Sequence, residues 1–207
     1  MKKLTIALFI IMLTGCGSTG GGFFGPGEFT IKKSDNRFSE SDSDIFTSSN
    51  NRISTKSIAG GTHIDDKGVF LNPAAVKSSN GDLKGLYLQL INLTGYDTNY
   101  GSPNRLGAIE SVSFVVDGQR PMVKKVSNSD SEWSSNTYYN SVSKSASSDI
   151  VESGRIALSL PEYEQVMGAK SLAVKITGDK RSVVYEQEDI STNFKINLKT
   201  FFEAHLN

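Results

Sequence analysis

The segment best suited to acid–base or metal chemistry is His63-Ile64-Asp65-Asp66. On a strand, His63 and Asp65 would point to the same face, which is the minimum arrangement for binding a metal or orienting a general base. No second histidine lies nearby, and a solvated loop after the preceding glycine pair explains the composition equally well. The other histidine, His205, falls on an apolar stripe at helical spacing, where a histidine at the edge of a core is the ordinary interpretation. We therefore expect no metal site, no cofactor and no catalytic residue.

Two shorter motifs match functional sites only in part. Ser141 and Lys144 have Ser-x-x-Lys spacing, but they fall in a Ser-rich stretch without the partner motifs of a serine acyltransferase. Asp97-x-Asn99-x-Gly101 repeats half of a calcium loop, but its glycine comes one position early and no glutamate follows at the required distance. No Gly-x-Ser-x-Gly elbow and no phosphate loop occurs. An enzyme, for example a hydrolase, is therefore the last of the alternatives.

The best candidate site is a set of five aromatic residues in or beside two polar loop regions. Tyr and Trp rings offer large, stiff contact area, and neighbouring Asn, Asp and Ser side chains add adaptable hydrogen bonds, as in loop-borne binding surfaces. The same rings could instead cover the faces and corners of a sheet. The candidates are Tyr96 and Tyr100 in residues 95–104, and Trp133, Tyr138 and Tyr139 in or beside residues 127–148.

The charge balance argues against a nucleic-acid partner. The chain has 207 residues with 22 Lys and Arg against 22 Asp and Glu, so no basic excess is available to bind a phosphate backbone. Its single Cys excludes an internal disulfide framework and any Cys-rich zinc site. The length suits one domain with additional segments.

The N-terminus has the layout of a signal peptide. Lys2 and Lys3 precede an apolar run over residues 4–13, and small residues follow at once. This run is too short to span a bilayer, because a spanning helix needs about 20 apolar residues. We therefore expect residues 1–15 to be removed.

The segment ends in Leu13-Thr14-Gly15-Cys16, which resembles the lipobox of bacterial lipoproteins. The resemblance implies that Cys16 becomes the first residue of the mature chain and that its thiol receives a diacylglycerol. Two or three acyl chains hold a protein on a membrane where one chain would bind reversibly. Gly17 follows rather than Asp, which by resemblance to enterobacterial sorting implies the outer membrane, with the domain in the periplasm. The alternative is an ordinary signal peptide beside a coincidental Cys.

Two regions of different composition follow the signal peptide. Residues 16–60 are rich in Gly, Ser, Asp and Asn and have few apolar residues, which predicts a flexible, lipid-anchored tether. Within it, the alternation at Phe29 and Ile31 could add an edge strand to the domain. Residues 61–207 show strand periodicity separated by turn residues, which predicts a single β-rich domain.

The expected fold is mainly β in the α+β class, an antiparallel β-sandwich-like domain with a short helix and a C-terminal amphipathic helix. Asp117-Gly118 suits the tight turn of one hairpin and Gly178-Asp179 the turn of another. The runs on either side of residues 135–142 are Ser/Asn-rich and are expected to be loops. The expected strands cover residues 85–94, 109–116, 121–126, 135–142, 155–159, 169–177 and 182–188.

Two helices are expected in the C-terminal third. Ser159 and Glu162 have the spacing of a capping box, which predicts a short helix over residues 160–167. Asp189 or Ser191 would cap the second helix. Its stripe consists of Ile190, Phe194, Leu198, Phe201, Phe202 and His205, at spacings of three and four.

These observations favour a non-enzymatic binding or assembly module held on the cell envelope by its lipid anchor, with an envelope protein as partner. The alternative is a module that binds glycan or peptidoglycan through the loop aromatics. A shallow aromatic strip lined by Asn and Asp would favour sugar, and a broad apolar patch would favour protein.

Overall fold

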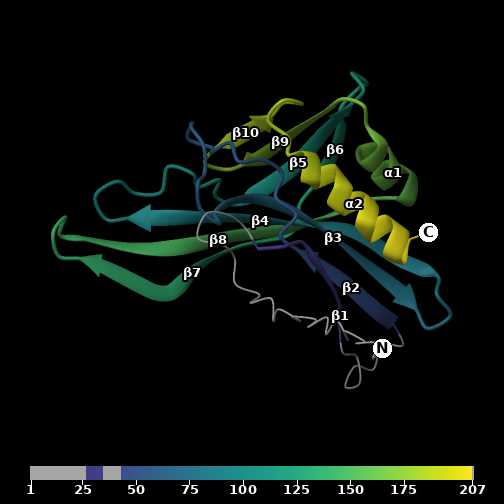
Figure 1. The fold of residues 1–207 in the computed structure, drawn as a ribbon, viewed down its shortest axis with the longest axis horizontal. Helices are drawn as coiled ribbons and strands as arrows, with labels where there is room; N and C mark the ends of the chain where they lie inside the picture. The colour runs from purple at the N-terminus through teal and green to yellow at the C-terminus, as the bar shows by residue number, and fades with distance from the viewer. Residues whose placement is uncertain (1–26, 35–42, 207) are drawn as a thin grey trace, which may run out of the picture.

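The computed structural model describes residues 27–34 and 43–206, without the side chains of residues 135 and 136 (Figure 1). The predicted signal peptide, Cys16 and Gly17 lie outside these residues. Two antiparallel sheets and two helices form the described part of the chain. No helix in that part is long and apolar enough to cross a membrane.

The larger sheet has six strands in the order β1-β2-β3-β4-β8-β7, and every neighbouring pair is antiparallel. Along β4, Leu86, Leu88 and Leu90 are buried and the residues between them are partly exposed, which is the period of a strand with one buried face. The strands are β1 (Thr30–Lys33), β2 (Ser43–Ser49), β3 (Gly68–Ser78), β4 (Leu83–Asp97), β7 (Ser127–Asn140) and β8 (Ser145–Ala157).

The smaller sheet has the order β10-β9-β5-β6. Asp117 and Gly118 have φ angles of 51° and 70°, and they make the predicted tight reversal between β5 and β6. The Asp117 carboxylate accepts hydrogen bonds from the backbone N–H groups of Lys170 and Ser171, both at 2.8 Å, and so holds this turn to the start of β9. The strands are β5 (Ile109–Val116), β6 (Met122–Lys125), β9 (Leu172–Gly178) and β10 (Ser182–Tyr185).

Both predicted helices form. The first helix, α1 (Leu160–Gly168), begins at the predicted capping box, where the backbone N–H of Ser159 donates to Glu162 Oε2 at 2.7 Å and that of Glu162 donates to Ser159 Oγ at 3.4 Å. The second is α2 (Thr192–His205), whose apolar stripe faces the domain. Its fully buried residues are Phe194, Leu198 and Phe201.

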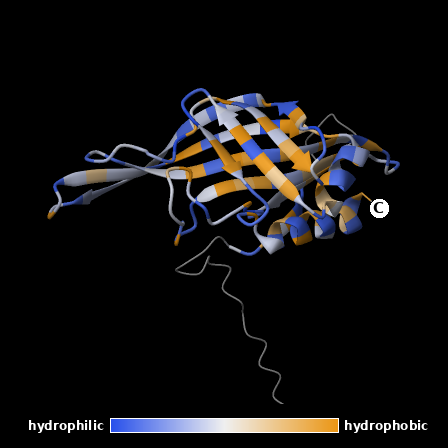
Figure 2. Cartoon of the chain, turned by 90° about the horizontal axis from the view of Figure 1, so that it is seen from above, coloured by the Kyte–Doolittle hydropathy of each residue, from blue (hydrophilic) through white to orange (hydrophobic). Residues whose placement is uncertain are grey.

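One apolar core joins the two sheets and α2. Leu71 and Leu88 of the larger sheet, Phe114 and Val174 of the smaller sheet and Phe194 of α2 are all fully buried in one cluster. Burying one such side chain contributes about 1.5–3 kcal/mol. Figure 2 shows apolar and polar residues alternating along the strands of this body. The prediction of a mainly antiparallel, β-rich α+β fold with sandwich-like sheets is confirmed.

The tether predicted for residues 16–60 is wrong for residues 43–60. β2 pairs with β3, and Ile53, which continues along the same edge of β3, is fully buried, with its N–H 2.9 Å from Val69 O. Polar residues here are buried because the fold satisfies them: Asn51 Nδ2, for example, donates to Leu71 O at 2.8 Å. Composition alone therefore misassigned this segment. The edge strand suggested by Phe29 and Ile31 forms as β1.

Three strands differ from the prediction. The sequence predicts no strand at β3, whose apolar residues come in a run rather than in strict alternation. β7 and β8 are both far longer than the predicted 135–142 and 155–159, and they include Ser-rich stretches expected to be loops. A polar strand satisfies its backbone by ladder hydrogen bonds just as an apolar one does, so side-chain polarity did not exclude it.

Candidate binding surface

The paired ends of β7 and β8 reach beyond the rest of the sandwich, with the end of β4 beside them (Figure 1). We call residues 95–101 and 133–148 the arm. The turn at its tip is fixed by Asn140 Oδ1, which accepts hydrogen bonds from the backbone N–H groups of Val142 at 2.9 Å and Ser143 at 3.2 Å. The arm is therefore an ordered extension of the larger sheet.

The arm exposes large side chains that carry no charge. Residues 133–143 contain no Lys, Arg, Asp or Glu. Trp133, Tyr138 and Tyr139 lie on the edge strand β7, and exposed aromatic side chains there are unusual unless they meet a partner, since edge strands are ordinarily protected by charges. The exposed fractions are 83% for Tyr100, 52% for Trp133, 68% for Tyr138, 69% for Tyr139 and 93% for Val142.

The structure brings two of the five predicted aromatic residues into contact. The ring centroids of Tyr96 and Trp133 lie 5.0 Å apart at an interplanar angle of 72°, which is a favoured edge-to-face geometry. Tyr96 pairs with Ser148, and Trp133 pairs with Ile150, so the two rings meet across the intervening strand β8. The contact braces the base of the arm.

The register places the other aromatic residues apart. Residues directly opposite in an antiparallel pair point to one face, and Tyr139 pairs with Ala146, two positions from Ser148. Tyr139 therefore shares the face of Tyr96 and Trp133. Tyr138 points to the opposite face, and Tyr100 lies in the turn after β4. The five rings thus present two faces and a turn rather than one strip.

The half calcium loop is an ordinary turn. Asp97 Oδ1 accepts the backbone N–H of Asn99 at 2.8 Å, and the backbone groups of Asp97 and Gly101 bond each other at 3.0 and 2.7 Å. Ser141 and Lys144 lie in the exposed turn at the tip of the arm. No group of three or more His, Cys, Asp or Glu residues that could hold a metal ion occurs among the residues described here.

Each of the two histidines contacts a neighbouring side chain. His63 Nδ1 lies 3.5 Å from Asp65 Oδ1, and burial, followed by the charge of Arg52, lowers the pKa of His63. The His205 ring stacks on Phe46 with centroids 4.2 Å apart, and burial lowers its pKa as well. His205 is thus a core-edge residue, as the helical spacing predicts.

Sequence reasoning missed a buried carboxylate, Glu152, at the base of the arm. Its side chain is fully buried and accepts four hydrogen bonds, which fasten residues 105–107 to β8 and β4. The sequence did contain a signal for a buried carboxylate, because Glu152 comes two residues after Ile150 and so would share the face of an apolar side chain on a strand. The donors are Asn92 Nδ2 at 2.9 Å, Arg105 Nε at 3.0 Å, Leu106 N at 2.7 Å and Gly107 N at 2.8 Å.

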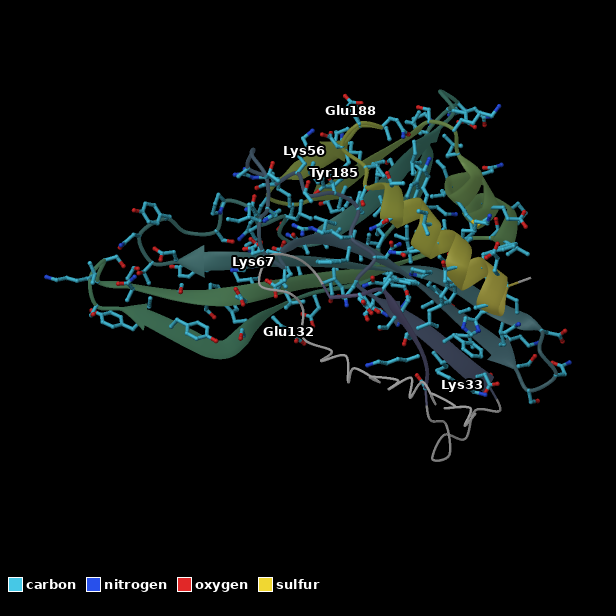
Figure 3. The ribbon with its side chains drawn as sticks, viewed as in Figure 1. Lys33, Lys56, Lys67, Glu132, Tyr185 and Glu188 are labelled. Atoms are coloured by element: carbon cyan, nitrogen blue, oxygen red, sulfur yellow. The ribbon has the colours of Figure 1, made fainter. Side chains whose placement is uncertain are left out.

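Sequence reasoning also missed a pocket, because most of the residues that line it fall in the segment assigned to the tether. It has a volume of about 450 Å³ and lies between residues 27–29, residues 50–55 and the start of α2. Lys56, labelled in Figure 3, helps to hold residues 50–66 in place. Its Nζ lies 2.6 Å from Oδ2 of Asp189, which precedes α2.

Comparison with known proteins gives no relative for this chain: no family model, no curated protein and no solved structure matches it.

Proposed function

We propose that this protein is a lipid-anchored component of the bacterial cell envelope, held in the outer membrane through Cys16, and that it acts as a non-enzymatic binding module whose arm docks on an envelope protein. The observation that carries the proposal is the projecting arm, with exposed aromatic side chains and no charge over residues 133–143. The anchor and the location rest on the lipobox resemblance and on Gly17.

The chemistry of the arm suits a protein partner. Tyr and Trp are enriched at the centres of protein interfaces, where charged residues are depleted. Burying Tyr138, Tyr139 and Val142 against a partner would remove apolar surface from water without desolvating an ion. Because residues 133–143 carry no charge, and the two charged residues of the arm, Asp97 and Lys144, have opposite signs, we expect binding that depends little on salt.

A glycan is the second candidate, favoured by the exposed Tyr139 ring on the face of the Tyr96–Trp133 pair. A flat exposed ring beside Asn and Ser side chains can stack on a sugar. The two faces of the arm argue for protein, because Tyr138 on the opposite face would not reach the same saccharide.

Photocrosslinking in intact cells tests the arm. A benzophenone amino acid placed at Tyr138 or Tyr139 should yield a discrete adduct whose second component is identified as protein by mass spectrometry. Val123 on β6 is 61% exposed and serves as the matched control, at which the adduct should be absent. An adduct with saccharide would favour the second candidate, and equal adducts from all three positions would refute a role for the arm.

The anchor is tested separately. The wild-type chain should carry the mass of acyl groups at Cys16 and fractionate with the outer membrane, and Cys16→Ser should lose both properties. An unmodified wild-type chain that leaves the membrane in a salt wash would refute the lipid anchor without bearing on the arm.

A further inference from the structure

Strand β7 leaves one edge of the larger sheet unpaired. It pairs with β8 on one side, and no described strand pairs with its other side. The backbone N–H and C=O groups along such an edge are a template on which another strand can pair. β7 has 14 residues, so this edge is far longer than any other sheet edge in the described part of the chain.

The other three edge strands have features that ordinarily prevent such pairing. β1, β6 and β10 have four residues each, and each has basic residues on it or directly before it, which disfavour the approach of a further strand. These residues are Lys32 and Lys33 on β1, Lys124 and Lys125 on β6, and Lys180 and Arg181 before β10. β7 contains no lysine or arginine, so it is the edge that the fold leaves open.

The charges near β7 are arranged so that two copies of the strand match when they run antiparallel. The two acidic residues of β7, Asp130 and Glu132 (Figure 3), lie near its start, and Lys144 lies in the turn after its end. All three are exposed, and none forms an ion pair with another described residue. Antiparallel pairing places the end of one strand beside the start of the other, so Lys144 of each copy would meet the acidic residues of the second copy.

The uncharged part of the edge suits contact between identical strands. Residues 137–140 pair with β8 without a register shift, so they form a regular edge. When Tyr138 lies opposite its own copy, Thr137 lies opposite Tyr139, and this contact occurs twice by symmetry. Aromatic and β-branched side chains directly opposite each other stabilise antiparallel strands. Glu132 and Lys144 lie six positions before and after Tyr138, so the same register places them opposite each other.

We propose that β7 pairs with β7 of a second copy of this chain, antiparallel about a twofold axis at Tyr138, so that the larger sheets of the two copies join into one. This rests on the proposed function, because it identifies the envelope protein on which the arm docks as the same protein. The uncharged residues 133–143 supply most of the contact area. The two Glu132–Lys144 pairs fix the direction of pairing, since exposed ion pairs contribute orientation more than affinity.

Photocrosslinking between two tagged copies identifies the occupant. Cells produce two versions of the full-length chain, one with a benzophenone amino acid at Tyr138 and one with a different epitope tag. The adduct should contain both versions and have twice the mass of one chain. The same amino acid at Val123 on β6, which is 61% exposed, should give at least tenfold less of this adduct. An adduct with a different protein would overturn the second copy and leave the proposed function intact, whereas an adduct with saccharide, or none, would overturn both.

Charge reversal in both copies tests the register. Glu132→Lys and Lys144→Glu each place like charges opposite each other, so each should lower the yield of the self-adduct at least threefold. The double variant restores opposite charges and should return the yield to within twofold of the wild type. Lys84→Glu, at an exposed position of β4 outside the arm, is the control and should leave the yield unchanged. Because all three side chains are exposed, melting temperatures should stay those of the wild type. Unchanged yields in both single variants, or no recovery in the double variant, would overturn antiparallel pairing about Tyr138.

Discussion

Arg105 Nε lies 3.0 Å from Oε1 of Glu152, a carboxylate that is fully buried beneath residues 104–107. Each Glu152 oxygen accepts two hydrogen bonds, so the group is saturated. Arg105 also reaches β7, where its Nη2 donates to Ser131 Oγ at 3.2 Å. This network joins the loop after β4 to both strands of the arm, and it explains how a long polar hairpin keeps a fixed direction.

Glu152→Gln should be strongly destabilising although it preserves shape. An amide NH₂ in place of either oxygen would face two donors, which leaves buried N–H groups unsatisfied and Arg105 without its counterion. We expect a loss of about 3 kcal/mol in the free energy of unfolding, measured by urea titration. Glu164→Gln, exposed on α1, should change it by no more than about 0.5 kcal/mol. Equal effects of the two variants would contradict the proposed network.

Stability should fall with mild acidification because of the histidines. The pKa values of His63 and His205 lie below their ordinary value of 6.5, in each case chiefly through burial. As the pH falls through 6.5, the unfolded chain therefore binds more protons than the folded chain, so stability is full above that pH and decreases below it.

His205→Phe isolates one histidine, since phenylalanine preserves the stack on Phe46 but cannot titrate. The decrease in the free energy of unfolding between about pH 7.5 and about pH 5.5 should be smaller in this variant than in the wild type. This window lies above the range in which Glu162 and Asp189, whose pKa values are lowered by Lys124 and Lys56, begin to take up protons. An unchanged decrease would mean that His205 is not linked to folding.

The sequence correctly identified the elements that are determined by interactions between residues close together in the chain. Asp117-Gly118 fixes a turn by backbone conformation, Ser159 and Glu162 cap α1 by mutual hydrogen bonds, and the stripe from Phe194 to Phe201 is buried as its spacing predicts. The aromatic residues of the arm were also found from the sequence, because Tyr and Trp stand out against Ser and Asn.

What was missed depends on contacts between distant segments. Asn51 is polar, and it is buried because β3, which lies later in the chain, supplies its hydrogen-bonding partners Leu71 and Asn72. Arg52 is buried with its guanidinium donating to the carbonyl oxygens of Ser54 and Asp65, and Ser191 N donates to Ile53 O beside it. The same long-range packing creates the pocket at α2. Composition does not show which distant segments pair, so the polar segments that form strands or line the pocket were assigned to loops or to the tether.

Ile53→Ala tests whether residues 43–60 belong to the folded domain. Ile53 is fully buried, so removing its side chain should lower the free energy of unfolding by about 2–5 kcal/mol. Ile64 is 75% exposed, and Ile64→Ala should cost no more than about 0.5 kcal/mol. Urea titrations of both variants check this prediction. If residues 43–60 were a flexible tether, Ile53→Ala would leave the free energy of unfolding unchanged, as Ile64→Ala does.

Substitutions on the two faces of the arm should have different effects, one on stability and the other on binding to the partner. Trp133→Ala removes the ring contact with Tyr96 and should cost about 0.5–1.5 kcal/mol beyond the buried area lost. Tyr138→Ala removes an exposed ring and should change the free energy of unfolding by no more than about 0.5 kcal/mol. Affinity for the partner captured by photocrosslinking should nevertheless fall at least tenfold in Tyr138→Ala and remain insensitive to salt, because residues 133–143 carry no charge. Unaltered affinity, or binding abolished by moderate salt, would show that the partner is held by a charged surface elsewhere on the domain.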